Sequence, residues 1–133
     1  MTLGVRGLII DKDERILLVK HTYVTGFYLP GGGVEPGETI VQALERELRE
    51  ECAISLKSPP LLHNIYLNKR SSLRDHVALF LIRDFSDEGP RLPDKEIAEV
   101  KYFSVNELPN EATPATRARI NEIINNTPTS SYW

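Results

Sequence analysis

Residues 32–54 place a glycine-rich turn directly before a stretch of helical periodicity that carries three glutamates. Glu47, Glu50 and Glu51 follow the spacing i, i+3 and i+4, and a helix of about 3.6 residues per turn brings these positions onto one face. Like charges at this spacing repel one another, so the pattern is expected only where a positive group lies between them. A hard cation such as Mg²⁺ or Mn²⁺ prefers oxygen ligands and meets that need.

The same stretch predicts an amphipathic helix with one irregular position. Its expected apolar stripe comprises Ile40, Val41, Leu44, Leu48 and Cys52. Glu51 projects between two residues of that stripe, and a carboxylate on a buried face requires a partner. Glutamates on a helix more often mark a solvated face, because glutamate is a good helix former. The glycine turn that precedes them favours a functional site instead.

The order of these residues resembles the signature box of the Nudix hydrolases. Gly32 is followed by five residues, Glu38, seven residues and then the run Arg-Glu-Leu-Arg-Glu-Glu at 46–51. The family pattern continues with any residue, a glycine and an aliphatic residue, whereas this chain has Ala53 in place of the glycine. A left-handed conformation is common just after a helix, and a Cβ there costs about 1 kcal/mol if φ is positive.

Two flanking segments add to the resemblance. Residues 27–32, Phe-Tyr-Leu-Pro-Gly-Gly, are similar to the family's aromatic-x-Leu-Pro-Gly-Gly approach to the box. Residues 102–109 are similar to a later family segment, in which an aromatic pair precedes a short Glu-Leu-Pro turn. The resemblance therefore extends over nearly the whole chain, from about residue 3 to residue 125.

The resemblance implies hydrolysis of a pyrophosphate linkage in a small molecule, a nucleoside diphosphate linked to a group X, with Mg²⁺ or Mn²⁺ as cofactor. By carry-over from the box, Glu47, Glu50 and Glu51 bind the metal. The backbone carbonyl of Gly31 or Gly32 adds a further ligand. One of the glutamates instead activates water in some family members, and which one does so here stays open.

Two further charged residues are candidates for catalytic roles. Arg46 lies four residues before Glu50, and it either orients the carboxylates through bidentate hydrogen bonds or is a surface i, i+4 partner. Some family members use an additional loop glutamate as base or ligand. Glu96, upstream of Tyr102, has the most comparable position, with Glu99 as the rival. An ordinary exposed acid is equally compatible with Glu96.

The residues that contact the substrate are less constrained by the sequence. Phe27 and Tyr28 flank the glycine turn, and they either stack a base or belong to the core. Lys69 and Arg70 lie in a basic segment that either contacts distal phosphates or forms a solvated loop. The histidines have no ligand-like spacing, so structural or surface roles are expected for His21, His63 and His76.

Length and composition limit the class of protein. A chain of 133 residues is one domain, large enough to bury a core. Sixteen Lys and Arg against nineteen Asp and Glu give a net charge of −3, which argues against a dedicated nucleic-acid binder. The single cysteine, Cys52, excludes an intrachain disulfide, and a core thiol is expected. Without a long apolar run or a secretory-signal pattern, a cytoplasmic location and no membrane partner are expected.

Hydrophobic periodicity predicts a mixed α/β domain. Strands are expected at 4–10, 15–20, 61–68, 76–83 and 99–103, with the first two joined as a hairpin and 76–83 central. Helices are expected in the box and after Thr113-Pro114, with a brief helical turn from Ser104 to Glu107. The expected fold is a Nudix-like three-layer α/β/α sandwich with a mixed central sheet. It comprises one domain over 1–126 and a C-terminal tail over 127–133.

Two alternative functions use the same fold. A non-hydrolytic nucleotide-binding regulator would bind its ligand without turnover, and the intact glutamate cluster argues against it. A pyrophosphohydrolase acting on RNA 5′ ends is also a Nudix activity, and the acidic net charge argues against it. Isopentenyl diphosphate isomerisation is excluded, because the catalytic cysteine of those family members lies outside the box and this chain has only Cys52. No sequence marker assigns the substrate or the oligomeric state.

Overall fold

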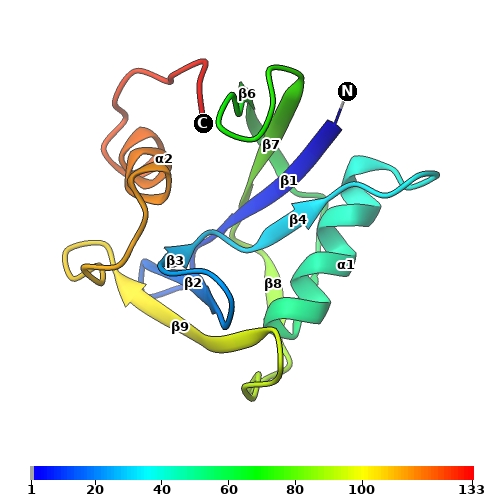
Figure 1. Ribbon diagram of the computed structural model, residues 1–133. Coiled ribbons are helices and arrows are strands. Elements are labelled where there is room, and N and C mark those ends of the chain that lie inside the picture. The colour runs from blue at the N-terminus through cyan, green and yellow to red at the C-terminus, as the bar shows by residue number, and fades with distance from the viewer. Residues whose placement is uncertain (1) are drawn as a thin grey trace.

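The computed structural model describes residues 2–133 and contains nine strands and two helices in that range (Figure 1). The strands are β1 (Thr2–Ile9), β2 (Arg15–His21), β3 (Phe27–Tyr28), β4 (Gly31–Gly33), β5 (Ile54–Leu56), β6 (Leu61–Leu67), β7 (Asp75–Ile82), β8 (Phe85–Asp87) and β9 (Ile97–Ser104). The helices are α1 (Ile40–Cys52) and α2 (Pro114–Ile124). Within residues 2–133, neither helix is long and apolar enough to cross a membrane.

The strands form a mixed sheet, an antiparallel sheet and a short pair. The mixed sheet has the order β4-β1-β7-β6, in which β1 and β7 are parallel and the other neighbours are antiparallel. The antiparallel sheet has the order β3-β2-β9, and β5 pairs with β8. Figure 1 shows α1 and α2 on opposite sides of these strands. The expected three-layer α/β architecture is confirmed, and the apolar strand β7 lies inside its sheet.

The hairpin expected between the first two strands is wrong. β1 pairs along its whole length with β7, whereas β2 pairs with β9, so the two strands lie in different sheets. Within residues 2–133, one isolated bridge between Ile10 and Ile16 joins them. The Asp11 carboxylate accepts hydrogen bonds from the Asp13 and Arg15 amides. This tight turn directs the chain from the mixed sheet into the antiparallel sheet.

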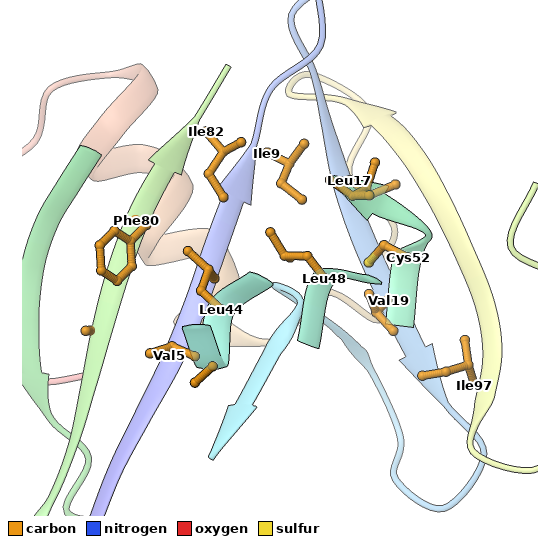
Figure 2. Close-up of a cluster of buried hydrophobic side chains, with 13 residues drawn as sticks. Val5, Ile9, Leu17, Val19, Leu44, Leu48, Cys52, Phe80, Ile82 and Ile97 are labelled. Carbon is orange, nitrogen blue, oxygen red and sulfur yellow. The ribbon is translucent and has the colours of Figure 1, made fainter. Parts of the chain in front are cut away.

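Helix α1 packs between the two larger sheets. Figure 2 shows Leu44, Leu48 and Cys52 among side chains of β1 and β7 on one side and of β2 and β9 on the other. These three residues are almost fully buried, as the expected stripe requires. Val41, in the first turn, is 36% exposed and is not part of the packed face, whereas Ile40 is partly buried against the same core. The sheets therefore hold α1 by its apolar face and leave its glutamate face directed toward the glycine turn.

Both ends of α1 are fixed by local hydrogen bonds. Thr39 caps the first turn: its side chain accepts from the Gln42 amide, and the Gln42 side chain accepts from the Thr39 amide. At the other end, Ala53 has φ 57° and ψ 39°, a left-handed conformation, and its amide donates to the Arg49 carbonyl. The turn that usually requires glycine is thus formed with an alanine.

Helix α2 covers the opposite side of the strands. Its start is as the sequence predicts, with Thr113 as N-cap and Pro114 in the first turn. Ile120 packs into the core, but Arg119 and Glu122 are buried as well. The apolar pattern of the helix does not predict this buried charged pair.

The helical turn expected at Ser104 is wrong. Ser104 ends β9, and its hydroxyl accepts a hydrogen bond from the Asn106 amide at 3.3 Å. The Glu107 amide donates to the Ser104 carbonyl at 3.0 Å, which closes a β-turn rather than opening a helix. The serine therefore stabilises a local turn through its own side chain.

Candidate active site

Glu51 is a buried carboxylate that contacts the glycine turn. It is 9% exposed, and its Oε1 accepts a hydrogen bond of 2.9 Å from the Gly31 amide. Burial raises the pKa of Glu51 to about 7, although the Gly31 hydrogen bond and the charge of Arg6 act in the opposite direction. Nε2 of His21 lies 3.8 Å from Oε2 of the same carboxylate. Glu51 is thus the most buried of the three glutamates of the box.

Glu47 lies against the next residue of the turn. A Cβ added to Gly32 would come within 2.5 Å of Glu47 Oε1, so the close approach of this carboxylate depends on a glycine. Arg46 donates from Nη1 to the same oxygen at 2.9 Å. The carboxylate is therefore fixed between the turn and a guanidinium.

Arg46 links the glycine turn to the helix. Its Nε and Nη2 donate to the Glu38 carboxylate at 2.7 and 2.9 Å, and Nη2 also donates to the Gly33 carbonyl at 3.1 Å. Nη1 lies 3.6 Å from Glu50 Oε2. The hydrogen bond from Arg46 is the main cause that lowers the pKa of Glu38 to about 2. A single guanidinium thus contacts Glu38, Glu47 and Glu50. A surface i, i+4 partner would contact Glu50 alone.

Glu50 and Glu96 are less enclosed. The Glu50 side chain is 59% exposed, while its backbone carbonyl accepts a hydrogen bond of 2.9 Å from Arg91 Nε. Glu96 is exposed in the loop before β9, and its carbonyl accepts from the Thr22 amide at 2.9 Å. Its charge raises the pKa of His21, although burial and Arg6 lower that pKa more strongly. The loop that carries Glu96 is therefore joined to the end of β2, next to Glu51.

The three glutamates of the box do not form a closed cluster in this arrangement. Among residues 2–133, no group of three His, Cys, Asp or Glu side chains is placed closely enough to hold a metal ion. Each carboxylate instead contacts a donor of the protein, such as the Gly31 amide for Glu51 and Arg46 for Glu47. Their oxygens nevertheless are the hard donors that suit Mg²⁺ or Mn²⁺, and Glu47 and Glu51 lie against Gly32 and Gly31 of the turn. The set of oxygen donors fits such a cation. The glutamate side chains would have to rotate to surround it.

A cavity of about 900 Å³ adjoins the glycine turn on the α2 side of the molecule. Its lining includes Arg6, Tyr28 and Leu29 at one end and residues of α2, of the turn after β6 and of the C-terminal segment elsewhere. Arg6 Nη1 donates to the Leu29 carbonyl at 2.9 Å and approaches the Gly31 carbonyl at 3.5 Å. The cavity therefore ends at Arg6 and Leu29, beside the glycine turn, while Gly31, Gly32 and the glutamates of the box are not among the described residues that line it.

The sequence-based candidates for substrate contact divide into two groups. Phe27 is 5% exposed and packs edge-on against Phe103, with ring centroids 5.1 Å apart, so it belongs to the core and is not free to stack a base. Tyr28 is half-buried and lines the cavity, as does Arg70. Lys69 lies beside the cavity, with its Nζ 4.6 Å from the centre of the Tyr132 ring.

Sequence reasoning missed Arg6 and His21. His21 lies at the end of β2, with its ring 5.3 Å from that of Tyr23 and 5.9 Å from that of Tyr28. Its Nδ1 is buried and has no hydrogen-bond partner among the described residues. Cys52 is a buried free thiol whose pKa is raised by burial, as expected for a core residue. No spacing in the sequence relates Arg6 or His21 to the box, because strand pairing brings them there.

A layered α/β fold in which a glycine turn is held against a glutamate-bearing helix defines the Nudix class of proteins. The chain belongs to the Nudix family: the family model described as the NUDIX domain matches residues 1–123. Two of the matched relatives are named as a pyrophosphatase and a putative diphosphatase, which places the chain among the hydrolases of the family.

Two relatives and one solved structure illustrate the similarity. An ADP-ribose pyrophosphatase of Methanocaldococcus jannaschii is 36% identical over 108 residues, which cover 78% of this chain and 63% of that protein. A putative 8-oxo-dGTP diphosphatase of Bacillus subtilis is 31% identical over 125 residues, or 93% of this chain and 80% of that protein. The chain thus spans less than two thirds of the first relative. The structure of a MutT NUDIX hydrolase from Burkholderia pseudomallei is similar with a TM-score of 0.78 and 26% identity, covering 92% of this chain and 97% of that one.

Proposed function

We propose that the protein hydrolyses a pyrophosphate linkage in a nucleoside diphosphate linked to a group X, with a divalent metal as cofactor. The observation that carries this proposal is the placement of Glu51 and Glu47 directly against Gly31 and Gly32. Two carboxylates held at a turn beside an open cavity suit an anionic substrate that arrives with a cation. The family to which the chain belongs supports the same reaction class.

Glu47, Glu50 and Glu51 are the residues that would hold Mg²⁺ or Mn²⁺, with the carbonyl of Gly31 or Gly32. A bound divalent cation supplies polarisation of the phosphoanhydride and acidification of a water. Arg46 acts as a positioning residue, because its contacts with Glu38 and Gly33 fix the turn relative to the helix. The glutamate that accepts the proton of the water stays open among those of the box and Glu96.

The cavity suits the remainder of the substrate. A volume of about 900 Å³ lies within the range of pockets that enclose small ligands. Arg6 and Arg70 place positive charge on its lining, which favours phosphate oxygens and the negative charge that develops in the transition state. Tyr28 and the side chains of α2 supply flat apolar and amide surface for a nucleoside. The two relatives are named for ADP-ribose and 8-oxo-dGTP. These compounds are therefore the first substrates to test.

The experiment is a hydrolysis assay of the purified protein with Mg²⁺ or Mn²⁺. The panel contains ADP-ribose, 8-oxo-dGTP, dGTP, a nucleotide sugar, a dinucleoside polyphosphate and an RNA with a 5′ triphosphate. We expect turnover of at least one small nucleotide that stops with EDTA and in Glu51→Gln, while circular dichroism shows an intact fold. Hydrolysis of RNA ends alone would favour the RNA alternative. Saturable nucleotide binding without turnover of any compound would favour a regulator.

A further inference from the structure

The segment 127–133 does not extend away from the domain. The Leu67 amide donates to the Ser131 carbonyl at 2.9 Å, and the Trp133 amide donates to the Leu67 carbonyl at 3.0 Å. These bonds form a parallel bridge along the outer edge of β6, which is the edge strand of the mixed sheet. Asn64 adds a hydrogen bond of 3.3 Å from Nδ2 to the Ser130 carbonyl. The segment is therefore a strap, and we use that name for residues 127–133.

A buried ion pair on α2 holds the strap. Arg119 and Glu122 have side chains that are each 3% exposed, and Nη2 of the arginine donates to Oε2 of the glutamate at 2.9 Å. Oε2 of Glu122 also accepts from the Ser130 amide at 3.0 Å. Nη1 of Arg119 donates to the Tyr132 carbonyl at 2.9 Å. Both charges are thus directed at backbone groups of the strap, which explains why they are buried.

Aromatic rings complete the anchor. The Arg119 guanidinium lies 4.4 Å from the ring centre of Tyr66 and 5.3 Å from that of Trp133. The Tyr66 and Trp133 rings meet edge-on at 5.4 Å, and the Tyr66 hydroxyl donates to Glu122 at 2.6 Å. The strap is therefore attached by backbone pairing, by charge and by contacts between aromatic rings.

The strap forms one wall of the cavity next to the glycine turn. Five of its residues line that cavity: Thr127, Pro128, Ser130, Tyr132 and Trp133. Tyr132 is 50% exposed, so a large part of its surface remains accessible. Arg119 also lines the cavity, and its buried Nε has no hydrogen-bond partner among the described residues. Asn68 and Asn121 contribute amide groups to the same lining.

We propose that the strap is a specificity-determining element, in which Tyr132 contacts the nucleobase of the substrate and Trp133 anchors the wall through Arg119. This inference rests on the proposed function, because it assigns the base-bearing part of the substrate to the cavity. An aromatic ring suits a base of any kind, since every base has a flat face that stacks. The neighbouring amides of Asn68 and Asn121 add donors and acceptors that distinguish one base edge from another. The strap acts on binding and selectivity, whereas the glutamates act on the chemical step.

Trp133 is the only tryptophan of the chain, so its emission reports directly on the strap. We would titrate the metal-free protein in EDTA with AMP and GMP, which carry a base but no pyrophosphate, and with inorganic phosphate. The expected result is a saturable change in tryptophan emission with at least one nucleotide and none with phosphate. Equal responses to phosphate and nucleotides would overturn the inference.

Variants of Tyr132 separate the ring from the rest of the strap. Tyr132→Ala is expected to weaken nucleotide binding and to raise KM about ten-fold, with kcat changed less than two-fold, because one base stacks on this ring. Tyr132→Phe keeps the ring and should restore the KM. Leu73→Ala is the matched control: Leu73 is 81% exposed in the turn after β6 and does not line the cavity. Thermal unfolding of each variant would confirm that the fold is retained.

The outcomes distinguish this inference from the proposed function. In one outcome, the wild-type protein hydrolyses a nucleotide while Tyr132→Ala leaves both KM and the ratio of kcat/KM between two bases unchanged. That result overturns the role of the strap and leaves the proposed function intact. A wild-type protein that hydrolyses no nucleotide but binds AMP or GMP, with binding lost in Tyr132→Ala, supports the strap and removes the proposed reaction.

Discussion

The Gly31 amide donates a hydrogen bond of 2.9 Å to Glu51 Oε1, and both residues are buried. The hydrogen bond favours the ionised carboxylate, while burial favours the neutral acid. Burial is the larger effect, since the pKa of Glu51 is raised from an ordinary value near 4.5 to about 7. The fold thus holds a carboxylate in a place that costs stability when it is charged.

This relationship leads to a prediction for stability and pH. Because the folded protein binds a proton at Glu51 more tightly than the unfolded chain, the contribution of Glu51 to stability falls as pH rises from about 4.5 to about 7, then levels off. The full loss is about 3 kcal/mol. Glu51→Gln keeps an oxygen for the Gly31 amide and removes this loss, so we expect it to be more stable than wild type at pH 8 in EDTA and inactive. Urea unfolding at pH 5 and pH 8 measures the difference.

Glu45→Gln provides the control for that experiment, because Glu45 lies on the exposed face of the same helix. We expect its free energy of unfolding to stay within about 0.5 kcal/mol of wild type at both pH values. If Glu51→Gln is destabilised at pH 8 to the same extent as at pH 5, burial of the charge is not the dominant effect.

Three consecutive glycines of β4 should respond differently to alanine. At Gly31, φ is 149° and a Cβ would lie 1.9 Å from the Val5 carbonyl oxygen, so Gly31→Ala is expected to lose about 3 kcal/mol or more of stability. At Gly32 the nearest atoms belong to the flexible Glu47 side chain, so Gly32→Ala should fold normally but lose about 10-fold to 100-fold in activity. Nothing lies within 4 Å at Gly33, and Gly33→Ala is the neutral control.

Thermal unfolding and kcat/KM, measured on the same three preparations, test this order. Gly32→Ala is the most informative of the three variants, because its thermal stability should stay near that of wild type while its kcat/KM falls. Retained activity in Gly32→Ala would mean that the contact between Glu47 and Gly32 has no role in the reaction.

The sequence predicted the local parts of the candidate site better than its assembly. The glycine turn, the helix and the contacts of Arg46 with carboxylates follow from spacing within one segment. Arg6 reaches the turn because it is paired with Gly31 across β1 and β4, and such a register depends on strands far apart in the sequence. The side-chain directions of Glu47, Glu50 and Glu51 likewise depend on hydrogen bonds to the turn, which helical spacing alone does not fix.

The same limit explains the errors in the fold. The apolar pattern predicts the first two strands correctly, but these strands pair with β7 and β9 instead of forming a local hairpin. In α2, the apolar pattern does not predict the burial of Arg119 and Glu122, because charged residues are seldom fully buried without a partner. The strap supplies the backbone partners that make their burial favourable.

Ala53 offers a stabilising substitution. It ends α1 with φ 57°, a conformation that costs an L-residue with a Cβ about 1 kcal/mol and glycine very little. We expect Ala53→Gly to raise the free energy of unfolding by about 0.5–1 kcal/mol, after the extra flexibility of glycine in the unfolded chain is included. Chemical denaturation measures it. Ala118→Gly, inside α2 where alanine is favoured, should instead lose about 1 kcal/mol.

The buried pair on α2 should behave unlike a surface pair. Arg119→Met leaves Glu122 charged and buried, and Glu122→Met does the same to Arg119, so each is expected to lose about 3–5 kcal/mol. The double variant should lose clearly less than the sum, because neither charge is then left unpaired. Arg83→Met is the control, since Arg83 and Glu14 are 53% and 63% exposed and their pair contributes at most about 1 kcal/mol. Additive losses in the double variant would show that the two residues stabilise the strap independently, through the Tyr132 carbonyl and the Ser130 amide.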